Sequence, residues 1–395
     1  MKRKASGATE RRLIVGSGDF GQATVDDAPG YKCINTKKKP KKGLLFISAP
    51  GTKSAAVEGF ATLPFHPQWI SAHPHNGLIY AAGDDDKLHA VSIDPQTLRA
   101  TVLSSMDSLG GSAFVEISSD GRFALCANYG SGVLCVLPIA EDGSIGPPSD
   151  SKQPWPLEGL DPALEDRQEA CHPHQVVLEP AAGKWALACD LGADRVWVYE
   201  FDTVRGALIG AINSDRHLRL PPGSGPRHLA FHPNGRVVYV LCELSGKLVT
   251  CGWDAAAGRL HVLESLGVMP KGVRCLRAHH SGLSHIAVTP DGSTVYAASR
   301  TDNQLVRFTA NPKTGKLSLA SRESTQGVCP RHFYVDDERL IICNQDTQTL
   351  RVASGGGALL DAQGICPNCI IDWAPQQAAA GSERAPAPKK AKKGK

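Results

Sequence analysis

The segment richest in chemically capable side chains runs from Arg167 to His174, reads RQEACHPH, and ends a 35-residue connection over residues 138–172. Loops of that length in a compact domain are usually functional or disordered. An imidazole can act as general base or general acid near neutral pH, so we predict that His172 or His174 is catalytic. The structural alternative, in which both imidazoles bind backbone groups at the start of a strand, stays open from spacing alone.

Arginines occupy repeated positions further along the chain. Arg227-His228 follows a Gly-Pro pair, Arg331-His332 follows a Cys-Pro pair 104 residues later, and Arg195 ends the segment DLGADR. Guanidinium groups match phosphate and carboxylate geometry with two parallel hydrogen bonds. These arginines are therefore predicted to hold an anionic substrate, with Arg195 and Arg227 also stabilising charge on a reacting carbonyl oxygen. The alternative is that they bridge neighbouring structural units.

Glu243 directly follows an apolar run, VVYVLC at 237–242. A carboxylate at the end of such a strand, near Arg and His, could orient the imidazole or accept a proton itself. The alternative is a structural carboxylate paired with an arginine. The corresponding ends of other apolar runs carry further side chains that could line the same pocket as hydrogen-bonding groups: Asn128, Arg300, Asn344 and Gln345.

Other patterns are better explained by structure than by chemistry. GSGDFG at 16–21 has the glycine spacing of a dinucleotide loop, but APG at 28–30 and a Lys-rich stretch follow where a helix would be needed. CPNC at 366–369 is a single Cys pair without a second pair at zinc spacing. No Gly-x-Ser-x-Gly elbow occurs, and the expected site offers more Arg and His than the carboxylates a hard cation needs. We therefore expect neither a cofactor nor a metal.

The candidate residues lie within a repeated pattern of an apolar alternating stretch, a turn and a second apolar stretch. The turn glycines are separated by 44, 62, 52 and 57 residues, about the length of four strands with their loops. Asn-Gly and Asp-Gly between apolar runs predict tight hairpins. We predict an all-β fold, a seven-bladed β-propeller, whose closing blade includes LLFISAP at 44–50 and ICPNCIIDW at 365–373. The turn glycines are Gly77, Gly121, Gly183, Gly235 and Gly292.

Charge is unevenly distributed along the 395 residues. Residues 1–42 contain 11 Lys/Arg against 4 Asp/Glu, residues 374–395 contain 6 against 1, and residues 43–373 contain 26 against 34. We predict an acidic propeller domain over 43–373 between a disordered basic extension, 1–42, and a disordered basic tail, 374–395. An acidic body disfavours nucleic-acid binding across the fold, whereas basic tails are also typical of nuclear targeting.

Targeting signals and cysteine usage give further expectations. No apolar run approaches the roughly 18 residues of a membrane span, and the N-terminus lacks the apolar region of a secretory signal. The 12 cysteines are scattered singly, which is typical of reduced, buried thiols. We expect a cytoplasmic monomer, with a nuclear location through the basic tails as the alternative.

Several strings resemble the seven-bladed propeller lactonase family, which includes cycloisomerase-type 6-phosphogluconolactonases and 3-carboxy-cis,cis-muconate cyclases. They are RQEACHPHQ at 167–175, DLGADRVWVYEFD at 190–202, GSGPRHLAFHPNG at 223–235 and CNQDTQTLRV at 343–352. The resemblance runs from about residue 43 to 373. Residues 1–42 have no counterpart in the family, and only 15 residues separate Pro50 from His66, which predicts a shortened first blade.

The resemblance implies hydrolysis of a small anionic lactone, with 6-phosphoglucono-δ-lactone as the leading substrate. A muconate-type cycloisomerase would use the same residues for carboxylate binding and proton transfer, and a non-catalytic propeller scaffold is the third alternative. The predicted catalytic residues are His172, His174, Arg195 and Glu243. The predicted substrate-binding residues are Arg167, Gln168, Arg227, His228, Arg300, Arg331 and Asn344.

Overall fold

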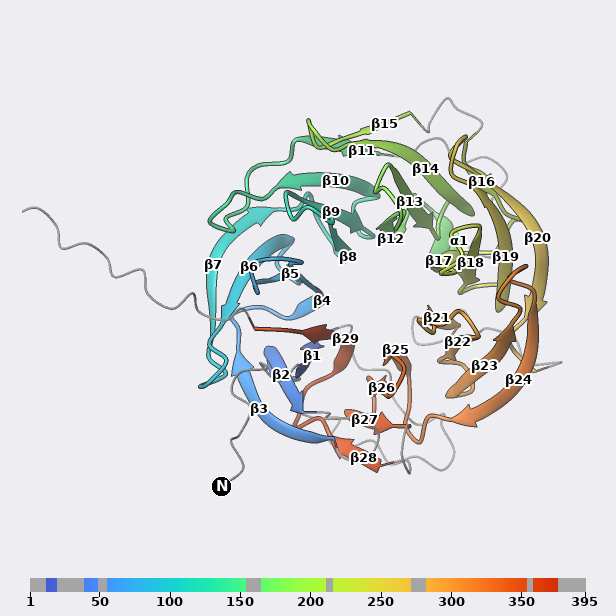
Figure 1. The fold of residues 1–395 in the computed structure, drawn as a ribbon. Helices are drawn as coiled ribbons and strands as arrows, with labels where there is room; N and C mark the ends of the chain where they lie inside the picture. Colours follow the sequence, from blue (N-terminus) through green and yellow to red (C-terminus); the bar gives the residue numbers. More distant parts are fainter. Residues whose placement is uncertain are drawn as a thin grey trace, which may run out of the picture.

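The computed structural model describes residues 12–19, 39–48, 55–153, 165–210, 216–270, 282–353 and 358–375. Within these ranges the chain forms seven antiparallel sheets, arranged as blades around a central channel (Figure 1). The predicted all-β, seven-bladed propeller is confirmed. One short helix, α1 (Glu165–Gln168), accompanies the strands in this part of the chain, where no helix is long and apolar enough to cross a membrane. Most of the predicted tail, 374–395, lies outside the described residues.

Each blade is a meander whose first strand lies at the channel and whose last strand lies at the rim (Figure 1). The closing blade contains, from the channel outward, β29 (Pro367–Trp373), β1 (Arg12–Ser17), β2 (Gly43–Ser48) and β3 (Ala56–Thr62). The next two blades contain β4 (Pro67–Ala72), β5 (Ile79–Gly83), β6 (Lys87–Ile93) and β7 (Ala100–Asp107), then β8 (Ser112–Ile117), β9 (Phe123–Asn128), β10 (Val133–Pro138) and β11 (Asp150–Lys152).

The remaining four blades follow in chain order. The fourth contains β12 (Pro173–Leu178), β13 (Trp185–Asp190), β14 (Arg195–Asp202) and β15 (Ala207–Ile209), with β16 (Leu218–Arg219) also paired to β14. The fifth contains β17 (Pro226–Phe231), β18 (Val237–Cys242), β19 (Lys247–Asp254) and β20 (Arg259–Gly267). The last two contain β21 (Leu283–Val288), β22 (Thr294–Ser299), β23 (Gln304–Ala310) and β24 (Leu317–Ser324), then β25 (Pro330–Val335), β26 (Leu340–Asn344), β27 (Thr349–Val352) and β28 (Ala358–Asp361).

The closing blade joins two distant parts of the chain. β1 lies between β2 and β29, with Ile14 opposite Phe46 on one side and Ile371 on the other. The prediction that residues 1–42 lie outside the propeller is therefore wrong for residues 12–17, and residues 1–11 and 20–38 of that extension lie outside the described residues. The predicted shortening of the first blade is also wrong, because the strand missing between Pro50 and His66 is supplied from upstream of it.

Two motifs from the sequence find structural roles in this blade. Gly16 and Ser17 belong to β1 and not to a phosphate-binding loop. A Cβ on Gly16 would lie 2.7 Å from the sulfur of Cys369, so the glycine allows β29 to approach closely. Cys369 is buried in β29, and all ten cysteines of the described residues are free and buried. The predicted packing role of Cys369 is confirmed.

Burial along the strands follows from their distance to the channel. The second strands β9, β13 and β18 are buried at every position, because neighbouring blades cover both of their faces. The rim strand β7 alternates between half-buried and exposed residues, since one of its faces meets solvent. Long apolar runs in the sequence therefore mark second strands, and alternating runs mark the rim.

The Gly-x-Leu signals before the rim strands have a packing reason. Gly206, Gly258 and Gly315 have φ values of 64°, 64° and 68°, a left-handed conformation that glycine adopts without a steric penalty. A Cβ at Gly258 would lie 2.6 Å from the ring of Trp185 in the preceding blade, and one at Gly315 would lie 2.7 Å from Val237. The glycines therefore permit each turn to pack closely against the blade before it.

Every inner strand begins with an irregular pairing. In β12, Pro173 pairs with Asp190 and Gln175 pairs with Cys189, so His174 is the additional residue of a β-bulge. The same register shift occurs at the start of the other six inner strands in the described chain. A bulge changes the direction of a side chain, and here it does so at equivalent positions around the channel. These bulge residues are Gln68, Ala113, His174, Arg227, Ser284, Arg331 and Asn368.

Candidate active site

A pocket of about 550 Å³ lies where the inner strands begin. Two equivalent positions, each contributed by four of the blades, supply most of its polar lining: the bulge residue of the inner strand and the residue that follows the second strand. Arg167, from α1, is added to these. The pocket thus collects side chains that are distant in sequence. The bulge residues in the lining are Gln68, Ala113, His174 and Arg331, and the residues that follow second strands are Asp84, Tyr129, Glu243 and Arg300.

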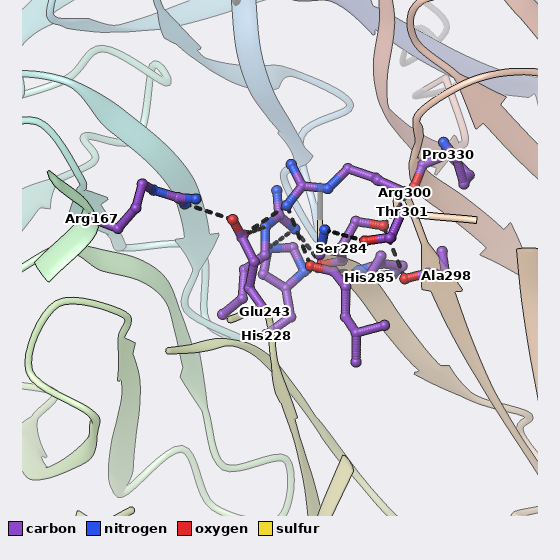
Figure 2. A network of polar contacts seen from close by, with 12 residues as sticks. Arg167, His228, Glu243, Ser284, His285, Ala298, Arg300, Thr301 and Pro330 are labelled. Carbon is purple, nitrogen blue, oxygen red and sulfur yellow. Dashed lines mark hydrogen bonds and ion pairs between the residues drawn. The ribbon is translucent and has the colours of Figure 1, made fainter. Parts of the chain in front are cut away.

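Glu243 binds three arginines. Arg167 and Arg300 line this pocket, whereas Arg227, predicted to bind substrate, lines a smaller cavity instead. Its Oε1 accepts a hydrogen bond of 2.6 Å from Arg167 Nη2, and its Oε2 lies 2.9 Å from Arg300 Nη2 and 3.0 Å from Arg227 Nε. Figure 2 shows Arg167 and Arg300 reaching the carboxylate from opposite sides. Burial raises the pKa of Glu243, but the charges of Arg300, Arg167 and Arg227 outweigh burial and lower that pKa overall. The carboxylate is therefore ionised and fixes the guanidinium groups; within the described residues none of its hydrogen bonds goes to a histidine.

Positive charge exceeds negative charge in this cluster. Arg331 lines the same pocket, and burial together with the charge of Arg300 lowers the pKa of Arg331 to about 10. Burial, Arg300 and Arg331 likewise lower the pKa of Arg227. Guanidinium groups stay protonated at neutral pH, so these pKa shifts reflect first the cost of burying the charges and then their mutual repulsion. A bound anion would offset that repulsion.

His174 is the imidazole that lines the pocket. The residue is 7% exposed, and its Nδ1 is buried without a hydrogen-bond partner among the described residues. Burial, and next the charge of Arg227, lowers the pKa of His174 well below 6.5, although Glu243 opposes the shift. The imidazole is therefore neutral at pH 7, which is the form that accepts a proton.

Aromatic rings fill the channel beyond the pocket floor. His228 Nδ1 lies 2.9 Å from His285 Nδ1, and the ring of His285 packs on that of His332 with centroids 3.9 Å apart. Trp69 meets His332 edge-on at 4.9 Å. His228, predicted to bind substrate, belongs to this layer and does not line the pocket. The smaller cavity, of about 20 Å³, shares four lining residues with the pocket. It is lined by Gln68, Trp69, Ala113, His174, Arg227, Arg331 and Asn368.

The structure does not bring His172 or Arg195 to the pocket lining. The His172 ring stacks on Tyr129 with centroids 4.4 Å apart, and its Nε2 lies 3.0 Å from Glu169 Oε1. Arg195 begins β14, the third strand from the channel, and donates from Nη1 to Ala193 O. Neighbouring strands are about 4.8 Å apart, so a third strand lies roughly 10 Å further from the axis than an inner strand. The prediction that Arg195 lies at the channel mouth is therefore wrong.

Gln168 and Asn344 also lie away from the pocket, and each binds backbone. Gln168 Nε2 donates to Leu191 O at 2.8 Å, and Asn344 Nδ2 donates to Thr325 O at 3.0 Å. Asn344 is the last residue of β26, as Asn128 is of β9. Because side chains alternate along a strand, a shift of one residue reverses the direction of the side chain. The residue after Asn128, Tyr129, therefore lines the pocket where Asn128 does not.

The sequence prediction missed the half of the pocket formed by the first three blades. Its side chains include Gln68, Ser112 and Tyr129, and three aspartates, Asp19, Asp84 and Asp86. The sequence did contain a signal for Asp84. Asp84 directly follows the second strand of its blade, β5, just as Glu243 directly follows β18. Within the described residues no group of three or more His, Cys, Asp or Glu side chains is arranged to hold a metal ion.

Fold and site together define a seven-bladed β-propeller with an arginine-containing pocket where its inner strands begin. The chain belongs to the lactonase family of seven-bladed propellers: the family described as "Lactonase, 7-bladed beta-propeller" matches residues 43–355. The 6-phosphogluconolactonase of Bacillus subtilis (strain 168) is 30% identical over 292 residues, which cover 72% of this chain and 79% of that protein. The 6-phosphogluconolactonase of Pectobacterium atrosepticum is 31% identical over 245 residues, covering 62% and 67%.

Solved structures agree with this assignment. The periplasmic gluconolactonase PpgL of Pseudomonas aeruginosa superposes with a TM-score of 0.75 at 25% identity, covering 93% of this chain and 99% of that one. A protein from Bacteroides uniformis, described as a putative 6-phosphogluconolactonase, gives a TM-score of 0.75 at 25% identity, covering 92% and 100%. The predicted family resemblance is confirmed.

Proposed function

We propose that the protein hydrolyses the ester bond of a small anionic sugar lactone. The observation that carries this proposal is the buried imidazole of His174, whose Nδ1 has no hydrogen-bond partner among the described residues and which lines one pocket with Arg167, Arg300 and Arg331. A base and several guanidinium groups are the parts that addition of water to an ester carbonyl requires. Membership of the lactonase family and the names of the relatives support the same reaction class.

In the proposed mechanism His174 accepts a proton from water while the water oxygen attacks the lactone carbonyl carbon. The carbonyl oxygen becomes an oxyanion, and N–H donors of Arg300 or Arg331 stabilise it. The ring C–O bond then breaks, and protonated His174 returns the proton to the departing alkoxide oxygen. The product is the open-chain hydroxy acid. Glu243 is a positioning residue here, because it holds Arg167, Arg227 and Arg300 in place.

The leading substrate in this proposal is 6-phosphoglucono-δ-lactone. The excess of positive charge around Glu243 complements a phosphate group, and guanidinium groups bind phosphate well. The relatives from Bacillus subtilis and Pectobacterium atrosepticum are both named 6-phosphogluconolactonase.

The test is a hydrolysis assay with the purified full chain, corrected for spontaneous ring opening. The panel contains 6-phosphoglucono-δ-lactone, glucono-δ-lactone and muconolactone, together with 3-carboxymuconate to detect ring closure. We expect hydrolysis of the sugar lactones, and a loss of about 10²–10⁴-fold in kcat for His174→Gln. Activity confined to ring closure of the muconate would replace the hydrolase with a cycloisomerase. No activity on any compound would leave a non-catalytic propeller.

A further inference from the structure

The pocket has an acidic wall across from Glu243 and Arg300. Asp84 and Asp86 come from the turn between β5 and β6, and Asp19 follows β1. The blade β4–β7 lies across the ring from the blades β17–β20 and β21–β24, which supply Glu243 and Arg300 (Figure 1). A ligand that fills the pocket therefore meets Arg300, which is paired with Glu243, on one side and the carboxylates of Asp84 and Asp86 on the other.

Asp84 and Asp86 each have one carboxylate oxygen that accepts a hydrogen bond from a backbone N–H group. Asp86 Oδ1 accepts a hydrogen bond of 2.6 Å from Gly111 N, and no contact of its Oδ2 is found among the described residues. Asp84 Oδ1 accepts a hydrogen bond of 2.8 Å from His66 N, and its Oδ2 lies 3.8 Å from Lys42 Nζ. Each aspartate thus uses one oxygen as an anchor. The other oxygen of Asp86 can accept a hydrogen bond from a ligand, whereas the other oxygen of Asp84 is shared with Lys42.

A second observation shows that this wall faces a ligand site. His174, which lines the same pocket, is 93% buried yet has no partner for Nδ1 among the described residues. A buried polar atom without a hydrogen bond is costly, so such atoms mark places where a ligand or water completes the structure. Asp84 and Asp86 are exposed to solvent, but they line the same pocket as this buried imidazole and therefore belong to that binding pocket.

We propose that Asp84 and Asp86 form a hydroxyl-binding wall, which selects polyhydroxylated lactones and rejects lactones with a second anionic group at that end. This inference rests on the proposed lactone hydrolysis. A ring hydroxyl donates to an ionised carboxylate in a charge-assisted hydrogen bond, whereas a carboxylate placed there meets a like charge. A sugar lactone with one anionic end fits both walls. A muconate-type compound, which carries carboxylates at both ends, does not.

The variants Asp86→Asn and Asp84→Asn test the wall by removing charge while keeping shape. Asp86 has a φ of 62°, a left-handed conformation that asparagine also tolerates. An asparagine oxygen can still accept from Gly111 N. The matched control is Asp85→Asn: Asp85 stands between the other two aspartates but does not line the pocket, and its Oδ1 binds His89 Nε2 at 2.9 Å.

The measurement is kcat/KM on glucono-δ-lactone, on δ-valerolactone, which has the same ring without hydroxyls, and on 3-carboxymuconolactone, which carries two free carboxylates. We expect Asp86→Asn to lose about 5–15-fold on the hydroxylated lactone, the difference between a charged and a neutral hydrogen bond. δ-Valerolactone should change by less than about 3-fold, and the relative rate on 3-carboxymuconolactone should rise. Asp85→Asn should match the native chain on all three. Equal losses on the hydroxylated and bare lactones, or no loss at all, would overturn the proposal.

Calorimetric binding of D-gluconate separates this inference from the proposed reaction. It requires no turnover, so it tests the wall even if the native chain hydrolyses none of the lactones. We expect affinity for gluconate to fall in Asp86→Asn by the same factor as kcat/KM and to stay unchanged in Asp85→Asn. Unchanged affinity in Asp86→Asn would contradict the wall, whatever the catalytic result.

Discussion

Replacing Glu243 with glutamine removes the charge that opposes four neighbouring guanidinium groups. The carboxylate is 3% exposed and lies within 3.0 Å of nitrogens of Arg167, Arg227 and Arg300. Breaking a buried ion pair by neutralising one partner typically costs about 3–5 kcal/mol, because the other charges stay buried without compensation. Glutamine keeps an oxygen that can accept a hydrogen bond, which favours the lower end of that range.

This cost converts to a modest but measurable shift in Tm. An unfolding entropy of about 2.1 cal/mol/K per residue gives roughly 0.7 kcal/mol/K for a body of roughly 330 residues. A loss of about 3–5 kcal/mol therefore lowers Tm by about 4–7 °C. Because the folded-state pKa of Glu243 is lowered, its stabilisation is present above the ordinary value of 4.5 and is lost as pH falls. The difference in Tm between the native chain and Glu243→Gln should accordingly become smaller at acidic pH.

The assay is thermal unfolding of both proteins at pH 7, with and without inorganic phosphate. Phosphate should raise the Tm of Glu243→Gln more than that of the native chain, since the variant carries more uncompensated positive charge. The matched control is Glu169→Gln, whose carboxylate is 52% exposed and pairs with His172. A drop of less than about 1 °C in Glu243→Gln, or equal drops in both variants, would refute the view that Glu243 organises the cluster.

Three further outcomes are expected. His174→Gln should lose far more kcat than His172→Gln. The kcat of His172→Gln should stay within about 10-fold of the native value, because His172 does not line the pocket. Similar losses of kcat in the two variants would contradict this assignment. The pH profile of kcat/KM should be flat from pH 6.5 to 8, because the pKa of His174 is lowered and its basic form is already present; an inflection in that window would show a different base. Deleting residues 1–18 should lower Tm sharply and reduce the yield of folded protein, because β1 is the second strand of a blade; an unchanged melting curve would mean that the closing blade is dispensable.

The repeat and the strand pattern could be predicted from the sequence because they are local. Alternating runs and turn glycines specify hairpins whatever the rest of the chain does, and their spacing gives the blade. β1 could not be found in the same way. Its strand is followed by residues 18–42, and its partner β29 lies more than 350 positions away. A closing strand of this kind shows the pattern of a strand but none of the spacing of the repeat.

Individual site residues were harder to predict than the fold. The spacing of Arg227 and Arg331 marked equivalent positions correctly, since each is the bulge residue of an inner strand. The direction of a side chain, however, depends on whether it falls on the last position of a strand or just after it. That single step separates Asn128, which is buried within its blade, from Tyr129, which lines the pocket.

The bulge at the start of each inner strand has a consequence for how this protein can be altered. The backbone irregularity, and not the identity of the side chain, directs these residues toward the channel, as the presence of Gln, Ala, His, Arg, Ser and Asn at equivalent places demonstrates. Six of these seven positions in the described chain line the pocket or the smaller cavity. A combinatorial library confined to them would sample new chemistries while every strand pairing stayed the same. The propeller therefore offers a scaffold whose substrate range can be redesigned with very few codons.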